Sequence, residues 1–218
     1  MQGTTLRLFK NELEEISMTN ILIIGATGSV GSVTRQYFLD NTDDQLTLMA
    51  RSTNRLGSLN ADRERALAGS VTDAATLKTA LQGQDVVFAA LSGNLAGMAQ
   101  SLVTAMDAAG VKRLLFIASM GIYNEIPSSL GASGNLQSNP MLRGYRAAAD
   151  VIEASDLNYT VIRPGWFDGG NDTDYEVTKK GEPFGGQDVS RKSIADLVMR
   201  LAHDVTLGSR DSLGINRK

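Results

Sequence analysis

The sequence predicts an α/β fold in which helices cover both faces of a doubly wound parallel sheet. Short apolar runs alternate with helical patterns from residue 20 to about residue 163. The runs are continuously apolar rather than alternating, which is typical of strands that are buried on both faces. A chain of alternating strands and helices forms a parallel sheet with right-handed crossovers. These two observations define the fold class.

The individual elements are expected in the following order. The predicted strands cover residues 21–24, 46–50, 66–68, 86–91, 114–118 and 159–163. A first helix runs through Val33 and Phe38, and later helices cover 73–81, 95–109 and about 141–154. Asp73 is expected to cap its helix, and Gly110 to end the next one in a left-handed conformation.

Two further segments are less regular. The stretch 121–140 is rich in Ser, Gly, Asn and Pro, and its length predicts a functional loop over the strand ends. After Gly165 we expect one strand that turns at 179–182 and a helix over 190–202. These elements would form a small C-terminal substrate cap.

Composition narrows the function classes. The 218 residues contain 42% hydrophobic and 21% charged residues, which indicates one globular domain over 18–218. A net charge of −3 argues against nucleic-acid binding. The chain has no cysteine and a single histidine, His203, which argues against a metal site or a Ser-His-Asp triad. We expect His203 to be solvated at a helix end, where a histidine suits the helix dipole.

The location and the first residues also carry expectations. No apolar run approaches the roughly 20 residues of a membrane helix. Residues 1–17 lack the features of a secretory or transit peptide, so we expect a cytoplasmic protein, either a monomer or a homodimer. Met18 would be the natural start and 1–17 an added extension. The alternative is a short amphipathic helix packed on the domain.

A glycine-rich turn follows the first predicted strand. Gly25, Gly28 and Gly31 have the spacing G-x-x-G-x-x-G directly before the first predicted helix. Such a turn lets the backbone approach a pyrophosphate, whose charge lies at the helix N-terminus. Gly25 would permit the turn, Gly28 the close approach, and Gly31 the packing of helix on strand. A turn without a ligand is the alternative. The predicted dinucleotide contacts here are Gly25, Thr27, Gly28, Ser29, Val30 and Gly31.

The residues at the end of the second predicted strand indicate which cofactor is preferred, NAD or NADP. An acid there would bind the ribose hydroxyls of NAD, whereas arginine suits the 2′-phosphate of NADP. The segment 51–55 reads R-S-T-N-R, with no acid between positions 45 and 60. Arg51 and Arg55 could form a phosphate clamp. We therefore predict NADP (NADPH), with NAD less favoured, and a solvated basic loop as the alternative.

Other contacts are expected where parallel strands end, because ligands of open sheets bind at their carboxyl ends. Simple turn chemistry is the alternative explanation for these polar segments. The predicted contacts at the strand ends are Ser70, Val71, Leu91, Ser92, Gly93, Ser119, Pro164, Gly165 and Trp166.

The chain resembles the atypical short-chain dehydrogenases/reductases, the NAD(P)H-binding, NmrA-like group that includes the biliverdin reductase B (flavin reductase) type. The resemblance covers about 19–202 and rests on GATGSVG, ARSTNRL, GQDVVFAALSG, AAGVKRLLFIASM and YTVIRPG. It implies a Rossmann-like fold and an NAD(P) cofactor. It does not name the substrate, because the group contains reductases, isomerase-like enzymes and redox-sensing regulators. In layout the flavin reductase type is most similar.

The departures from the family pattern are informative. The wider superfamily uses a tyrosine and a lysine four apart on the helix after the fifth strand. Here Tyr145 is followed by Ala149, so the pair is absent. Tyr175 and Lys179 are also four residues apart, but they lie in a predicted hairpin, and we interpret this spacing as a coincidence. The flavin reductase type has a histidine where this chain has Trp166, so its best-placed imidazole is missing.

The resemblance implies that Ser119 lies beside the nicotinamide, and Ser119 is our predicted catalytic residue, as a hydrogen-bond donor to a substrate oxygen. Hydride transfer to a flat ring requires mainly juxtaposition of the two rings. Trp166, Phe167, Tyr123 and Met120 would form an apolar platform for such a ring, or else be ordinary packing.

We therefore predict an NADPH-dependent oxidoreductase that passes hydride to a small flat acceptor such as a flavin or quinone. The alternative is a non-catalytic NADP(H)-sensing regulator of the NmrA-like type, favoured by the missing tyrosine–lysine pair. Epimerase-like or ether-reducing chemistry is a third possibility.

Overall fold

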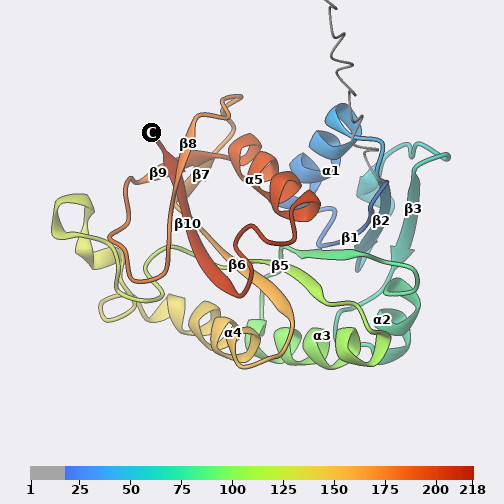
Figure 1. Ribbon diagram of the computed structural model, residues 1–218, viewed down its shortest axis with the longest axis horizontal. Coiled ribbons are helices and arrows are strands. Elements are labelled where there is room, and N and C mark those ends of the chain that lie inside the picture. Colours follow the sequence, from blue (N-terminus) through green and yellow to red (C-terminus); the bar gives the residue numbers. More distant parts are fainter. Residues whose placement is uncertain (1–17) are drawn as a thin grey trace, which may run out of the picture.

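The computed structural model describes residues 18–218, and within this range eight strands form one main sheet (Figure 1). Their order is β3-β2-β1-β4-β5-β6-β10-β8. Neighbouring strands run parallel except β10 and β8, which are antiparallel. The strands are β1 (Asn20–Ile24), β2 (Gln45–Ala50), β3 (Glu64–Ala68), β4 (Val86–Ala89), β5 (Arg113–Ile117), β6 (Asn158–Pro164), β8 (Tyr175–Thr178) and β10 (Asp211–Arg217).

Helices cover both faces of the sheet (Figure 1). One layer contains α1 (Ser29–Asn41) and α5 (Arg191–His203), and the other contains α2 (Ala74–Ala80), α3 (Leu95–Ala109) and α4 (Arg143–Glu153). The strand order reverses between β1 and β4, where a crevice opens at the carboxyl ends of the strands. The predicted fold class is confirmed.

Burial on both faces explains the continuously apolar strands. In β1, Leu22 and Ile24 pack into the core beneath α2, α3 and α4, whereas Ile21 and Ile23 pack into the core beneath α1 and α5. All four side chains are at most 3% exposed. Successive side chains of a strand point to opposite faces, so a strand covered on both sides must be apolar throughout.

Local signals placed the helix ends correctly. The Asp73 carboxylate accepts hydrogen bonds from the amides of Ala75 and Thr76 at the start of α2. Gly110 follows α3 with φ 73° and ψ 11°, the left-handed conformation that favours glycine. The loop after β5 contains the short 3-10 helices η2 (Ser128–Leu130), η3 (Ala132–Gly134) and η4 (Pro140–Leu142), and η4 leads directly into α4.

The region after Gly165 differs from the small cap that we expected. The helix α5 covers the main sheet, and β8 and β10 extend it. Only β7 (Trp166–Asp168) and β9 (Asp188–Ser190) form a separate two-stranded sheet. The strand β10 was missed because it reads D-S-L-G-I-N-R, and its buried Ser212 and Asn216 interrupt the apolar pattern.

His203 ends α5, as expected, but it is not simply solvated. Its Nε2 lies 2.7 Å from the Oδ2 atom of Asp44, whose side chain is 1% exposed. The other Asp44 oxygen accepts a hydrogen bond from the amide of Thr19. A buried carboxylate is costly without partners, so the Asp44 carboxylate holds the His203 imidazole against the protein.

Two further expectations concern the chain ends and membranes. The extension over 1–17, and the amphipathic helix considered as its alternative, lie outside the described residues. Among residues 18–218, no helix has the length and apolar character needed to cross a bilayer.

Candidate functional site

The glycine turn between β1 and α1 is formed by close backbone contacts. Gly25 has φ +86°, and its amide donates to the carbonyl of Met49 at 2.9 Å. A Cβ on Gly25 would overlap the carbonyl oxygen of Ala90, and one on Gly31 would overlap that of Gly25. A Cβ on Gly28 would meet only the Gly25 oxygen, at 3.1 Å. Gly25 and Gly31 therefore fit the turn itself, whereas Gly28 borders open space.

The N-terminus of α1 lacks a side-chain cap. Its N-cap is Gly28, and its first turn contains no acid. By contrast, α2, α3 and α5 are capped by Asp73, Asn94 and Ser190. Uncapped amides at a helix N-terminus are donors with a partial positive charge, and they suit an anion such as a phosphate.

A cavity of about 200 Å³, here called the glycine-turn pocket, opens over the ends of β1 to β4. It brings together nine of the residues predicted from the sequence. Eight others do not line it: four of them lie in the second cavity described below, Ser29 is exposed, Val30 and Gly31 are buried, and Gly93 lies outside the wall. The nine predicted residues that line the glycine-turn pocket are Gly25, Thr27, Gly28, Arg51, Arg55, Ser70, Val71, Leu91 and Ser92.

Arg51 and Arg55 enter this pocket without a counterion. Both are exposed, and neither guanidinium forms a hydrogen bond or ion pair with any residue in 18–218. Two unpaired guanidiniums beside uncapped helix amides make the pocket strongly favourable for phosphate groups.

The loop that carries these arginines is fixed by a pair that the sequence reading missed. Arg35 of α1 forms an ion pair with Glu64 of β3 at 2.5 Å, and donates to the carbonyls of Leu56 and Ser58. Burial alone would raise the pKa of Glu64, but the hydrogen bonds from Arg35 and from the Asn60 amide outweigh it, and the pKa is lowered. Arg35 and Glu64 are 29 residues apart, so no local pattern connects them.

A second cavity of about 400 Å³, here called the β5–β6 pocket, lies over the ends of these two strands. It contains the predicted residues Ser119, Pro164, Gly165 and Trp166. Its walls contain no Asp, Glu, Lys, Arg or His. The lining is Ala118, Ser119, Met120, Gly134, Asn139, Met141, Leu142, Tyr145, Pro164, Gly165, Trp166 and Phe167.

Three of the four expected platform residues line the β5–β6 pocket, but Tyr123 does not. The Tyr123 hydroxyl donates to Glu153 at 2.5 Å. Arg146, Arg163 and Lys180 place their cationic groups 4.9, 5.2 and 4.5 Å from its ring centroid. Burial and the Glu153 hydrogen bond raise the pKa of Tyr123 well above its usual range. Tyr123 is therefore a packed structural residue.

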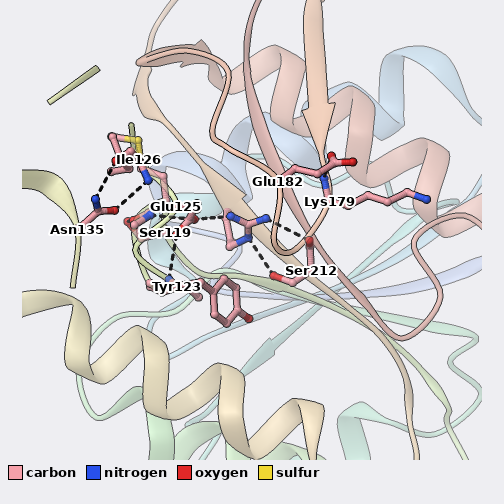
Figure 2. Close-up of polar contacts among 12 residues, drawn as sticks. Ser119, Tyr123, Glu125, Ile126, Asn135, Lys179, Glu182 and Ser212 are labelled. Carbon is pink, nitrogen blue, oxygen red and sulfur yellow. Dashed lines mark hydrogen bonds and ion pairs between the residues drawn. The ribbon is translucent and has the colours of Figure 1, made fainter. Parts of the chain in front are cut away.

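A buried ion pair connects the two walls of the β5–β6 pocket (Figure 2). The Arg163 guanidinium pairs with Glu125, and these side chains are 0% and 4% exposed. Glu125 accepts from the amides of Gly121 and Tyr123 at 3.0 and 2.9 Å. Arg163 donates to the hydroxyl and carbonyl of Ser212 at 3.0 and 3.2 Å. The pair thus holds the loop that follows Ser119 against β6 and β10.

The reactive groups in the β5–β6 pocket are hydroxyls. Ser119 donates to the carbonyl of Met120 at 3.1 Å, and Tyr145 contributes its phenol to the wall. Ala149, at the position where the superfamily has lysine, is fully buried. The Tyr175 hydroxyl donates to Asp196 of α5, and Figure 2 shows Lys179 well apart from Ser119. Tyr175 and Lys179 therefore form no catalytic pair with Ser119, although their sequence spacing matches that of the superfamily pair.

A larger hollow of about 920 Å³ runs along α2 and α3. Its walls include Gln84 and Val111, which precede β4 and β5. It therefore extends toward the amino ends of the strands, whereas ligands of open parallel sheets bind at the carboxyl ends. Size alone does not identify the functional site here.

The strand order, the uncapped helix behind a glycine turn and the unpaired arginines define a Rossmann-like dinucleotide-binding protein. Comparison with known families agrees. The chain belongs to the NAD(P)H-binding family of atypical short-chain dehydrogenases/reductases, whose family model, described as NAD(P)H-binding, matches residues 25–205. This is a family of NAD(P)H-dependent oxidoreductases.

Three relatives illustrate its range. A short-chain dehydrogenase/reductase from Veillonella parvula, solved in complex with NADP, is 26% identical with a TM-score of 0.84, covering 91% of this chain and 94% of that one. An uncharacterized sugar epimerase, YhfK, from Bacillus subtilis is 29% identical over 66% of this chain and 71% of its own. An NAD(P)H azoreductase from Xenophilus azovorans is 27% identical over 67% of this chain but only 48% of its own length.

Proposed function

We propose that this protein is an NADPH-dependent reductase that transfers hydride to a flat acceptor such as a flavin or quinone. The observation that carries the proposal is the β5–β6 pocket, whose apolar and aromatic walls hold hydroxyls but no acid, base or cation. β4 and β5 are neighbours, so this pocket lies beside the glycine-turn pocket along one edge of the sheet. A ring bound there would adjoin the cofactor.

The choice of NADPH rests on Arg51 and Arg55. Both lack a partner in the described chain, and both line the glycine-turn pocket at the end of β2. The family's cofactor is NAD(P)H, and a guanidinium pair at this position suits the 2′-phosphate that distinguishes NADP from NAD. The Veillonella relative, solved with NADP, is consistent with this choice.

When bound, the reduced nicotinamide supplies the hydride. The chain supplies binding and orientation. The amides at the start of α1 would receive the pyrophosphate, and Trp166 and Phe167 would provide an apolar surface for the acceptor ring. Ser119 can rotate its hydroxyl from the Met120 carbonyl toward an acceptor oxygen. No Asp, Glu, Lys, Arg or His lines the pocket, so we expect the acceptor to take its proton from water. Such chemistry depends mainly on juxtaposition.

The reductase assignment has support from outside the site. The Xenophilus relative is named an NAD(P)H azoreductase. The sequence resemblance to the flavin reductase type includes the R-x-x-x-R spacing of Arg51 and Arg55. The Bacillus relative is called a sugar epimerase, and the wider superfamily pairs a tyrosine with a lysine four residues further on. Tyr145 lines the β5–β6 pocket, but no lysine does.

Cofactor choice is tested by equilibrium titration of NADPH and NADH with wild type, Arg51→Ala and Arg55→Ala. Each change should weaken NADPH binding by about 1.5–3 kcal/mol, the range for hydrogen bonds to charged groups, and leave NADH binding nearly unchanged. Lys78→Gln in α2, an exposed cation away from both pockets, is the control. Unchanged NADPH affinity in both arginine variants would refute the NADP assignment.

The acceptor is tested by mixing the protein with NADPH and FMN, riboflavin or a small quinone, and following nicotinamide absorbance. We expect turnover with at least one acceptor, and a lower rate in Trp166→Ala and Ser119→Ala. Absence of turnover with every acceptor would instead favour the NADP(H)-sensing regulator. Buried Ala149 in place of the superfamily lysine is the observation that keeps this second function open.

A further inference from the structure

A further hollow, of about 380 Å³, runs along α1 from Ser32 to Asp40 and is closed by the first turn of α5 and the loop that follows β7. We call it the α1–α5 hollow. It is lined by Ser32, Val33, Gln36, Tyr37, Asp40, Gly169, Gly170, Asn171, Arg191 and Lys192.

Arg191 has an unusual environment in this hollow. Its Nε atom is buried and has no hydrogen-bond partner in the described part of the chain. Its guanidinium carbon lies 4.9 Å from the ring centroid of Phe167, which also lines the β5–β6 pocket. Stacking on an aromatic ring fixes the plane of a guanidinium but leaves its N–H donors unsatisfied. A buried donor without a partner is costly, which points to a missing acceptor.

The surrounding carboxylates do not supply that acceptor. Asp168 is near enough for Arg191 to help lower its pKa, but it accepts hydrogen bonds from Gly170 and Arg217. Asp40 accepts from Gln36 at 2.7 Å. Lys192, the second cation of the hollow, has no ion pair within residues 18–218 either. The hollow is therefore lined by two cations, Arg191 and Lys192, and one carboxylate, Asp40.

The backbone at Arg191 is held firmly. The Ser190 hydroxyl donates to the carbonyl of Asp172 at 2.6 Å and accepts from the Ser193 amide at 2.8 Å. The Ser193 hydroxyl donates to the same Asp172 carbonyl at 2.9 Å. A cation on a fixed backbone and stacked on a ring is preorganised, so binding an anion requires little ordering.

We propose that the α1–α5 hollow binds an anionic group, a phosphate or a carboxylate, and that Arg191 is the residue that contacts it. Two ligands could supply the anionic group. One is the cofactor, whose pyrophosphate would lie near the start of α1. The other is an acceptor in the β5–β6 pocket whose anionic tail reaches past Phe167, and in that case the inference rests on the proposed function.

The test compares Arg191→Gln, Arg191→Lys and the remote control Lys78→Gln with wild type. In the first arm, NADPH affinity is measured at equilibrium. In the second, FMN and riboflavin are titrated into the NADP⁺ complex and followed by flavin fluorescence. These two flavins share one ring system and differ in a phosphate, and this arm does not depend on turnover. Thermal unfolding checks that each variant is folded.

We expect Arg191→Gln to weaken one of the two ligands by about tenfold or more, the loss typical of a charge-assisted hydrogen bond. Weaker NADPH binding with unchanged flavin binding assigns the hollow to the cofactor. Selective loss of FMN relative to riboflavin assigns it to the acceptor. Arg191→Lys should recover part of the loss because it retains the charge. If Arg191→Gln weakens neither NADPH nor FMN, the proposal is overturned, whether or not the protein proves to be a reductase.

Discussion

Glu125 and Arg163 form a buried ion pair that joins the loop after β5 to the strand β6, and so joins the two walls of the β5–β6 pocket. Arg163 directly precedes Pro164 and Gly165, whereas Glu125 holds the amides of the loop that follows Ser119. Both charges are satisfied by further hydrogen bonds, which a buried pair requires.

Breaking this pair should be strongly destabilising. Glu125→Leu leaves the Arg163 charge buried without a counterion, and we expect a loss of about 3–5 kcal/mol in the free energy of unfolding, measured with urea. The double variant Glu125→Leu/Arg163→Leu should lose less than the sum of the two single changes. The exposed pair Arg146–Asp150 is the control, and Asp150→Asn should cost about 0.5 kcal/mol or less. Additive losses would show that the two residues are not coupled.

The three glycines of the turn should separate stability from binding. Gly31→Ala places a Cβ against the carbonyl oxygen of Gly25, so we expect a loss of about 1–3 kcal/mol in unfolding free energy from overpacking. Gly28 has φ −77°, which alanine adopts readily, and it lines the glycine-turn pocket, where its Cβ would meet only the Gly25 oxygen at 3.1 Å. Gly28→Ala should therefore fold normally and bind NADPH at least about tenfold more weakly, because a methyl group obstructs the pyrophosphate. Normal NADPH binding by folded Gly28→Ala would contradict this role.

Arg217 should control the mobility of Trp166. Its guanidinium contacts Asp168 at 3.0 Å, Asp172 at 3.2 Å, and also Asp188, so it ties β7 and β9 to β10. Arg217→Ala leaves three carboxylates that repel one another, and β7 should loosen. Trp166 is the single tryptophan of the chain, so its fluorescence anisotropy reports this directly. We expect lower anisotropy in Arg217→Ala.

The control for this experiment is Lys218→Ala, because Lys218 lies 3.5 Å from Asp174 and outside the cluster. Anisotropy equal to that of wild type in Arg217→Ala would rule out the restraint. Hydrogen bonds lower the pKa values of Asp168 and Asp172 below their ordinary 3.8. The restraint should thus persist above that pH and be lost as the pH falls through the lowered values.

Tyr37 and Tyr175 should make stability sensitive to alkaline pH. Both phenols donate to Asp196, at 2.7 and 2.6 Å, and link α1, β8 and α5. Burial, followed by the Asp196 hydrogen bond, raises each pKa from 10.0 to about 12. Because the folded pKa is raised, the stabilisation is complete below about pH 10 and is lost as the pH rises through about 12.

Thermal unfolding between pH 9 and about pH 12 measures this dependence. Tyr37→Phe should lower the melting temperature at neutral pH and flatten the alkaline decline. Tyr145→Phe is the control, because the Tyr145 hydroxyl has no partner among the residues described here. An alkaline decline as steep in Tyr37→Phe as in wild type would mean that other groups cause it.

Local patterns were sufficient for β1 to β6 and for one half of the candidate site. Apolar runs located β1 to β6, and Asp73 and Gly110 marked helix ends, because these signals depend on neighbouring residues in the chain. The glycine turn and Arg51 fell in one pocket because parallel strands all end at the same edge of the sheet. Whether these residues bind the dinucleotide remains a prediction.

The second half of the site could not be derived in this way. Tyr123 was grouped with Trp166 because both are aromatic and near strand ends, but the ion pair between Glu125 and Arg163 directs the loop so that Tyr123 lies among cations outside the pocket. Tyr145 lines the pocket although its sequence motif is incomplete. Such outcomes depend on pairings between residues far apart in the chain.

By itself the sequence determined a doubly wound sheet, a glycine turn ready for a pyrophosphate and an arginine pair at the end of β2, since each is written in a short segment. Only the tertiary structure decided that β10 completes the sheet, that Arg35 and Glu64 fix the arginine loop, and that Arg191 stacks on Phe167 with an unpaired donor. Burial of polar groups was the deciding physical factor. A buried charge or N–H is costly without a partner, and in a folded chain the available partners are set by proximity in space rather than in sequence.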